Sequence, residues 1–219
     1  MRHLNLFKDE TNEYCLKWIK IAIAEEQLNT LYLIDRNKWK QELINRINKR
    51  TNESIARNDL VHKYAWAIPC KAALEKIKKY SPIIEIGAGS GYWAYLLKEI
   101  GVEIVASDIN PPKENEEVNT WHPNNKCWTE IIEGGIELIE RYPNHTLFLC
   151  WPPYNDPLAY NTLKSYKGKY FIFIGESEGG CTGDEKFFKY LEDTFEEIDT
   201  VIIPQYDGVH DYLTIYERK

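Results

Sequence analysis

The sequence lacks the paired cysteines, long apolar runs and low-complexity tracts that mark several classes of protein. Its five cysteines are scattered and never form a C-x-x-C pair, which argues against both a disulfide framework and a zinc site. Its longest apolar runs, at 146–153 and 170–175, fall well short of the ~20 residues that a membrane-spanning helix needs. The first residues carry no secretory signal pattern. We therefore expect a cytoplasmic protein with no metal site and no membrane span.

Composition and charge narrow the class of protein and its possible partners further. The 219 residues are 43% hydrophobic and 28% charged, which suits one α/β core with an appendage. Residues 1–80 carry 16 basic and 10 acidic side chains, whereas residues 81–219 carry 11 and 24. An acidic main body repels phosphate backbones, so nucleic acid is disfavoured as a partner, although the basic N-terminal part keeps it open as an alternative.

Hydrophobic periodicity divides the chain near residue 80. Apolar residues recur at helical spacing over 11–50 and again over 57–80, which predicts a helical N-terminal cap at residues 1–80. From residue 81 onward, short apolar runs alternate with helical patterns, which predicts an α/β domain at residues 81–219.

The second part begins with a βαβ unit. A strand at 83–86, a helix at 92–100 and a strand at 102–107 must give parallel strands joined by a right-handed crossover. Further strands are expected at 128–133, 146–150, 170–174, 200–203 and 211–217, and further helices at 136–141, 156–166 and 184–195. The last two strands are separated by a short turn, which permits only a hairpin, so the last strand should run antiparallel.

A glycine loop follows the first strand and opens the next helix. Its glycines, Gly87, Gly89 and Gly91, permit positive φ and let a ligand approach the backbone. Tyr92 stands where a dinucleotide fingerprint has its third glycine, which argues against NAD or FAD. Asp108 ends the second strand, where a carboxylate can accept hydrogen bonds from both hydroxyls of a ribose. The pattern predicts a nucleoside ligand with a free diol.

These features resemble the class I S-adenosylmethionine-dependent methyltransferases. The resemblance rests on Glu85-x-Gly87-x-Gly89-x-Gly91, on Asp108, on the Pro-Pro-Tyr at 152–154 and on the C-terminal hairpin, and it covers about residues 80–219. It implies a Rossmann-like seven-stranded sheet of order 3-2-1-4-5-7-6. It also implies S-adenosylmethionine as cofactor, lying across the C-terminal ends of the first strands.

The resemblance also implies roles for individual residues. The three glycines would pass beneath the methionine and ribose moieties, Glu85 would brace the loop, and Asp108 would bind the ribose. The other residues that we expect to contact the cofactor are Tyr64, Ala88, Tyr92, Trp93, Ile109, Trp128, Cys150, Trp151 and Pro152.

Two positions depart from the family pattern. Gly134 stands where the family often has an acidic residue for the adenine amino group, so backbone contacts or Trp128 would have to substitute. Trp151 stands before Pro-Pro-Tyr, where the amino-methylating branch has Asp or Asn. An indole N–H cannot accept a hydrogen bond from a target amino group, which argues against methylation of a nucleic-acid base or a glutamine amide.

Methyl transfer from a sulfonium needs alignment, desolvation and, for some acceptors, removal of a proton. Aromatic residues suit a sulfonium and a flat substrate, and Trp151 is the one that we expect at the reacting centre. Glu176, in a glycine-flanked loop after the fifth strand, is the first candidate for a base, or else a solvated loop acid. His210 is a second candidate, and His122 could titrate near neutrality or be structural.

The sequence therefore predicts an S-adenosylmethionine-dependent methyltransferase whose helical cap encloses a small, flat acceptor. Three alternatives stay open at this point: methylation of RNA or protein through the basic N-terminal face, including Arg46, Lys49 and Arg50; a regulatory module that binds the cofactor without transfer; and a dehydrogenase.

Overall fold

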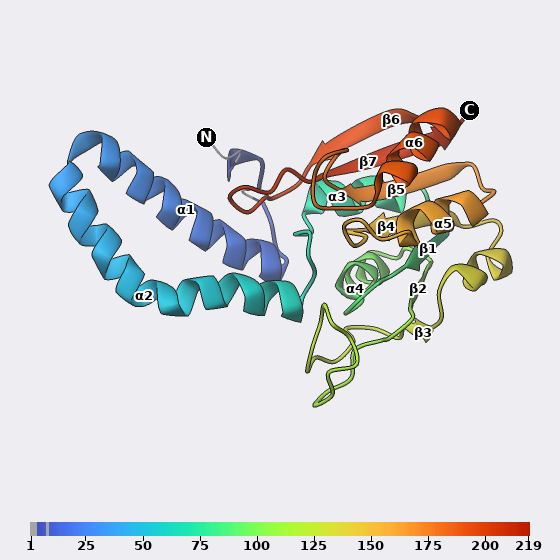
Figure 1. Cartoon of the computed structure of the whole chain (residues 1–219), viewed down its shortest axis with the longest axis horizontal. Helices are drawn as coiled ribbons and strands as arrows, with labels where there is room; N and C mark the ends of the chain where they lie inside the picture. Colours follow the sequence, from blue (N-terminus) through green and yellow to red (C-terminus); the bar gives the residue numbers. More distant parts are fainter. Residues whose placement is uncertain (1–3, 8) are drawn as a thin grey trace.

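A long helical hairpin projects from an α/β body (Figure 1). The structure, a computed structural model, describes residues 4–7 and 9–219, apart from the side chains of residues 5 and 46–56. The hairpin consists of α1 (Glu13–Ile34) and α2 (Arg36–Lys63), and a short 3-10 helix, Leu4–Phe7, precedes it. The side chains of Arg46, Lys49 and Arg50 lie outside the described residues. Within the described part of the chain, no helix is both long and apolar enough to cross a membrane.

Side-chain caps start both helices of the hairpin. Asn12 accepts a hydrogen bond from the Cys15 backbone at 2.8 Å, and Asp35 accepts two from the first turn of α2. The base of the hairpin is anchored in the core: Trp18 of α1 and Val61 of α2 are buried, and Trp18 Nε1 donates to the Gln205 carbonyl at 3.0 Å. The far end is exposed. The hairpin is therefore an arm held at one end.

The body contains the predicted seven-stranded sheet, with strands in the order β3-β2-β1-β4-β5-β7-β6. All neighbouring pairs are parallel except those that involve β7, which confirms the expected antiparallel last strand. The strands are β1 (Ile83–Ile86), β2 (Ile104–Asp108), β3 (Ile132–Glu133), β4 (Thr146–Cys150), β5 (Tyr170–Gly175), β6 (Phe195–Ile202) and β7 (Tyr212–Arg218).

Two hydrophobic layers cover the sheet, one on each face. Because side chains alternate along a strand, Ile83 packs into the layer that contains α3 and α4, whereas Ile84 packs into the layer that contains α5 and α6. The same alternation points Glu85 toward the first layer, where it is buried. The helices of the body are α3 (Lys71–Lys78), α4 (Tyr92–Glu99), α5 (Leu158–Ser165) and α6 (Glu185–Thr194).

The structure differs from the sequence-based expectation in four places. β6 begins at Phe195 rather than at residue 200. The strand expected at 128–133 is reduced to β3, because residues 109–131 form a long irregular loop that folds back over the body. Residues 136–141 form a 3-10 helix rather than an α-helix. The hairpin extends away from the sheet (Figure 1), so its two helices do not cover the C-terminal edge of the sheet as the expected cap would. The division at residue 80 stays a prediction.

Candidate active site

A cavity of about 430 Å³ lies at the C-terminal ends of β1, β2 and β4. This is the edge at which open α/β sheets bind ligands. Its walls come from the glycine loop after β1, the ends of β2 and β4, the 109–131 loop and the segment after α2. Of the described residues before residue 81, Ala65 and Trp66 line it. The enclosure expected of the helical cap is therefore supplied by this short segment and by the 109–131 loop.

The glycine loop leaves its backbone open to the cavity. Gly87 has φ of +73°, and a Cβ built there would meet only Leu158, at 3.8 Å. Gly89 has φ of +54°, and a Cβ there would lie 2.5 Å from Nε2 of His122. Glycine is thus required at both positions by conformation, and at Gly89 also by packing.

Asp108 fixes this loop from the end of β2. Its Oδ2 accepts a hydrogen bond from the Gly89 backbone at 2.9 Å, and its Oδ1 accepts one from the Asn110 backbone at 2.9 Å. Burial raises the pKa of Asp108, and these two N–H donors oppose that shift. The carboxylate borders the cavity and keeps lone pairs for a ligand.

Glu85 is the second carboxyl group of the cavity. It is 1% exposed, and its Oε2 has no hydrogen-bond partner among the described residues. Burial, followed by the neighbouring Asp108 carboxylate, raises the pKa of Glu85 to about 8. Asp108 makes the hydrogen bond to the glycine loop, and the bracing role expected of Glu85 stays a prediction. Glu85 presents an unpartnered polar group beside the cavity.

His122 reaches the cavity from the 109–131 loop. Its Nδ1 lies 2.6 Å from the His62 carbonyl oxygen, which can only accept, so Nδ1 carries the hydrogen and Nε2 is a free acceptor. Burial lowers the pKa of His122 to about 4, so the ring is neutral at pH 7. Asn119 holds this part of the loop, because its Oδ1 accepts from the backbones of Trp121 and His122 at 3.0 and 2.9 Å.

Three tryptophans from separate segments meet at the cavity wall. Trp66 stacks on Trp151 with ring centroids 5.8 Å apart and an interplanar angle of 28°. Trp121 meets Trp66 edge to face at 5.5 Å and 84°. All three line the cavity, which places Trp151 where the sequence analysis expected an aromatic residue. We call Trp66, Trp121 and Trp151 the tryptophan wall.

Most of the expected cofactor contacts border this cavity, but four do not. Those that border it are Glu85, Gly87, Ala88, Gly89, Trp93, Asp108, Ile109, Cys150, Trp151 and Pro152. Gly91 of the glycine loop does not line the cavity, and neither do Tyr64, Tyr92 and Trp128, whose rings contact one another. Tyr64 stacks on Trp128 at 5.3 Å, and Trp128 Nε1 donates to the Lys63 carbonyl at 2.7 Å. These rings pack on one another and do not line the cavity, and the expected contact of Trp128 with the adenine stays a prediction.

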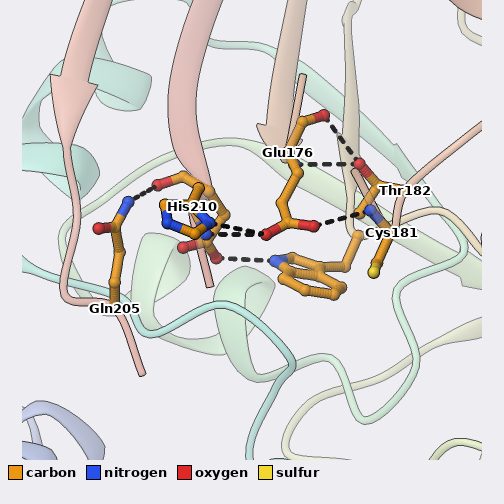
Figure 2. A network of polar contacts seen from close by, with 7 residues as sticks. Glu176, Cys181, Thr182, Gln205 and His210 are labelled. Atoms are coloured by element: carbon orange, nitrogen blue, oxygen red, sulfur yellow. Dashed lines mark hydrogen bonds and ion pairs between the residues drawn. The ribbon is translucent and has the colours of Figure 1, made fainter. Parts of the chain in front are cut away.

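The structure places Glu176 and His210 outside the lining of the cavity. Figure 2 shows the polar contacts that Glu176 makes instead. The backbones of His210 and Cys181 donate to the two carboxylate oxygens of Glu176 at 2.8 and 2.7 Å. Burial would raise the pKa of Glu176, but these N–H donors outweigh it and bring the pKa below its ordinary value. The side chain of His210 is exposed. Glu176 therefore closes a loop, and neither residue is placed to take a proton from a substrate in the cavity.

Sequence reasoning missed Asp211, at the end of the β6–β7 connection. It is 1% exposed, and its Oδ2 accepts a hydrogen bond from Trp151 Nε1 at 2.8 Å. Its Oδ1 has no partner in the described part of the chain. Burial raises the pKa of Asp211 to about 7, against the effect of the Trp151 hydrogen bond. Sixty residues separate the pair, so no local pattern marks it.

The sheet order 3-2-1-4-5-7-6, the antiparallel last strand and the glycine loop followed by Asp108 define the fold of the class I S-adenosylmethionine-dependent methyltransferases. The chain has this fold, and the resemblance seen in the sequence is confirmed at that level.

The solved structures that are similar to the chain include three methyltransferases. A 1,6-didemethyltoxoflavin-N1-methyltransferase from Burkholderia thailandensis is 15% identical, with a TM-score of 0.44 over 68% of this chain and 77% of that one. The magnesium protoporphyrin IX methyltransferase of Synechocystis PCC 6803 is 12% identical, with a TM-score of 0.43 over 68% and 76%. An S-adenosylmethionine-dependent methyltransferase from Archaeoglobus fulgidus is 15% identical, with a TM-score of 0.40 over 74% and 94%.

Comparison with sequences adds a different relative. A phosphoglucomutase/phosphomannomutase of Thermococcus kodakarensis is 31% identical over 136 residues, which are 57% of this chain and 26% of that protein. The chain thus spans about a quarter of the relative's length. No family model matches the sequence.

Proposed function

We propose that the chain is an S-adenosylmethionine-dependent methyltransferase that acts on a small molecule. One observation carries the proposal: the open backbone of Gly87 and the Asp108 carboxylate, which is locked to Gly89, border the same cavity at the C-terminal edge of the sheet. A small acceptor suits a cavity of about 430 Å³ that the chain's own loops surround.

The residues of the cavity fit the cofactor. Asp108 offers acceptor oxygens to the hydroxyls of a ribose, and Gly87 leaves room for the chain of atoms that leads from the ribose to the amino-acid end. Ile109 and Leu158 supply apolar walls suited to an adenine ring. The unpartnered Oε2 of Glu85 suits the cationic amino group of the cofactor, since a buried carboxyl group gains most from a charged hydrogen-bond donor.

When bound, S-adenosylmethionine supplies a methyl group that is already activated for transfer. The chain then has to orient the acceptor and exclude water. The tryptophan wall provides rigid faces for both tasks. His122 offers a neutral Nε2 that can accept a hydrogen bond from an acceptor N–H or O–H. With a pKa of about 4, it orients the acceptor rather than storing its proton at neutral pH.

Calorimetric titration with S-adenosylhomocysteine, S-adenosylmethionine and NAD tests the proposal. We expect the two adenosyl compounds to give heat and NAD to give none. Asp108→Asn keeps one oxygen for the Gly89 N–H but loses the charge, and we expect it to weaken S-adenosylhomocysteine binding by about tenfold or more. Asp193→Asn, on the exposed face of α6, is the matched control. Binding of NAD alone would replace the proposal with a dehydrogenase.

A further inference from the structure

The charge of the cavity is one-sided. The side chains that line it include three carboxyl groups, on Glu85, Asp108 and Asp156, and no lysine or arginine among the described residues. The imidazole of His122 is neutral at pH 7, because burial lowers its pKa to about 4. Burial raises the pKa of Glu85 to about 8, so the negative charge of the cavity at pH 7 comes from the other two carboxyl groups. An anionic ligand would therefore meet repulsion with no basic partner, whereas a cationic ligand would be attracted.

The tryptophan wall favours flat ligands, and like the carboxyl groups it favours cationic ones. Indole faces bind flat rings by stacking and bind cations through the negative charge of the π face. Trp121 is 47% exposed, so part of its surface is free for a ligand. A buried indole N–H, on Trp66, has no partner in the described part of the chain. A ligand with an acceptor atom in the plane of its own ring can accept a hydrogen bond from this N–H, which removes the cost of an unpaired buried donor.

Asp211 fixes the orientation of this wall. Trp151 has φ of +52°, a backbone conformation that residues with side chains rarely adopt. This conformation fixes the direction in which the indole leaves the main chain. The hydrogen bond from Trp151 Nε1 to Asp211 Oδ2, at 2.8 Å, restrains the orientation of the indole. Asp211 does not line the cavity, and it is a positioning residue that acts through Trp151.

We infer that the acceptor is a flat aromatic molecule of zero or positive charge, bound against Trp66, Trp121 and Trp151, and that the site rejects phosphorylated or carboxylated acceptors. The inference rests on the proposed function and names the substrate class of the same cavity. It also disfavours methylation of RNA, because the acceptor nucleotide would bring its phosphates to a cavity without basic side chains.

Three probes of similar shape and different charge test the inference on the full chain with S-adenosylhomocysteine bound. They are quinoline, 1-methylquinolinium and quinoline-2-carboxylate, which are neutral, cationic and anionic at neutral pH. Binding is measured by calorimetry and by quenching of tryptophan fluorescence. We expect quinoline and 1-methylquinolinium to bind, and quinoline-2-carboxylate to bind at least about tenfold more weakly than either.

Substitutions test whether the probes bind at the tryptophan wall. We expect Trp121→Ala to weaken 1-methylquinolinium binding by about fivefold or more and Trp121→Phe to restore much of it. Trp39→Phe, on the helical arm, is the control for fluorescence. Asp211→Leu should weaken probe binding, and Asp211→Asn, which keeps an acceptor for Trp151 Nε1, should restore it.

The outcomes separate this inference from the proposed function. Absence of S-adenosylhomocysteine binding in the unsubstituted chain overturns both. If that ligand binds, the inference alone is overturned by equal affinity for the anionic and cationic probes, by binding of none of the probes, or by probe affinities that Trp121→Ala leaves unchanged. An effect of Asp211→Leu that Asp211→Asn does not reverse removes the positioning role.

Discussion

The buried carboxyl group of Glu85 should make the free energy of unfolding depend on pH, and one substitution should remove that contribution. Burial and the nearby Asp108 raise the pKa of Glu85 from 4.5 to about 8. The folded chain therefore holds this proton over a pH range in which the unfolded chain has released it. Because the folded state then binds more protons, the free energy of unfolding falls as the pH rises from about 4.5 to about 8.

The size of the effect follows from the same two pKa values. At about 1.4 kcal/mol for each pKa unit, the full shift corresponds to about 5 kcal/mol, and relaxation around a buried charge reduces this to about 2–5 kcal/mol. Glu85→Gln carries no charge at any pH. We therefore expect the variant to be more stable than the unsubstituted chain by about 2–5 kcal/mol at about pH 9, and by less than about 1 kcal/mol at about pH 5.

Urea unfolding at a series of pH values, without added ligand, measures this difference. Glu178→Gln, at an exposed acid, is the matched control and should leave the curve unchanged. Asp211, whose pKa burial raises to about 7, contributes a slope of the same sign that remains in the variant. A Glu85→Gln protein that is no more stable than the unsubstituted chain at high pH would refute the reasoning.

Two further predictions concern the glycine loop and His122. Gly87→Ala should abolish S-adenosylhomocysteine binding, because its Cβ would enter the open space beside the cavity. Gly101→Ala has a similar φ of +83° and nothing within 4 Å, so it should lower stability by about 1 kcal/mol and leave binding intact. Nitrogen NMR should show the His122 ring neutral down to about pH 5, since burial lowers its pKa to about 4; a midpoint near neutrality would contradict the burial described above.

The sequence predicted those parts of the site that local rules determine. Asp108 could be found because a strand end at a fixed spacing from a glycine loop places a carboxylate at one edge of a parallel sheet. The sheet order came from the family resemblance, and the antiparallel end also from the short connection before the last strand.

Long-range contacts could not be predicted in this way. The 109–131 loop has no periodicity, so the sequence could not show which residues of the cavity Trp121 and His122 would meet. Tyr64, Tyr92 and Trp128 were expected at the ligand because they flank the loop, but they pack against one another and do not line the cavity. Glu176 has the surroundings of a base in the sequence, and only the structure shows both of its oxygens bound by backbone N–H groups.

A crystal structure of the chain grown with S-adenosylhomocysteine tests the central claim most directly. We expect the ribose hydroxyls within hydrogen-bond distance of Asp108, with the ligand passing over Gly87 and its sulfur directed toward the tryptophan wall. A ligand bound elsewhere would contradict the account. So would a cavity that is occupied by the protein's own side chains and holds no ligand at saturating S-adenosylhomocysteine.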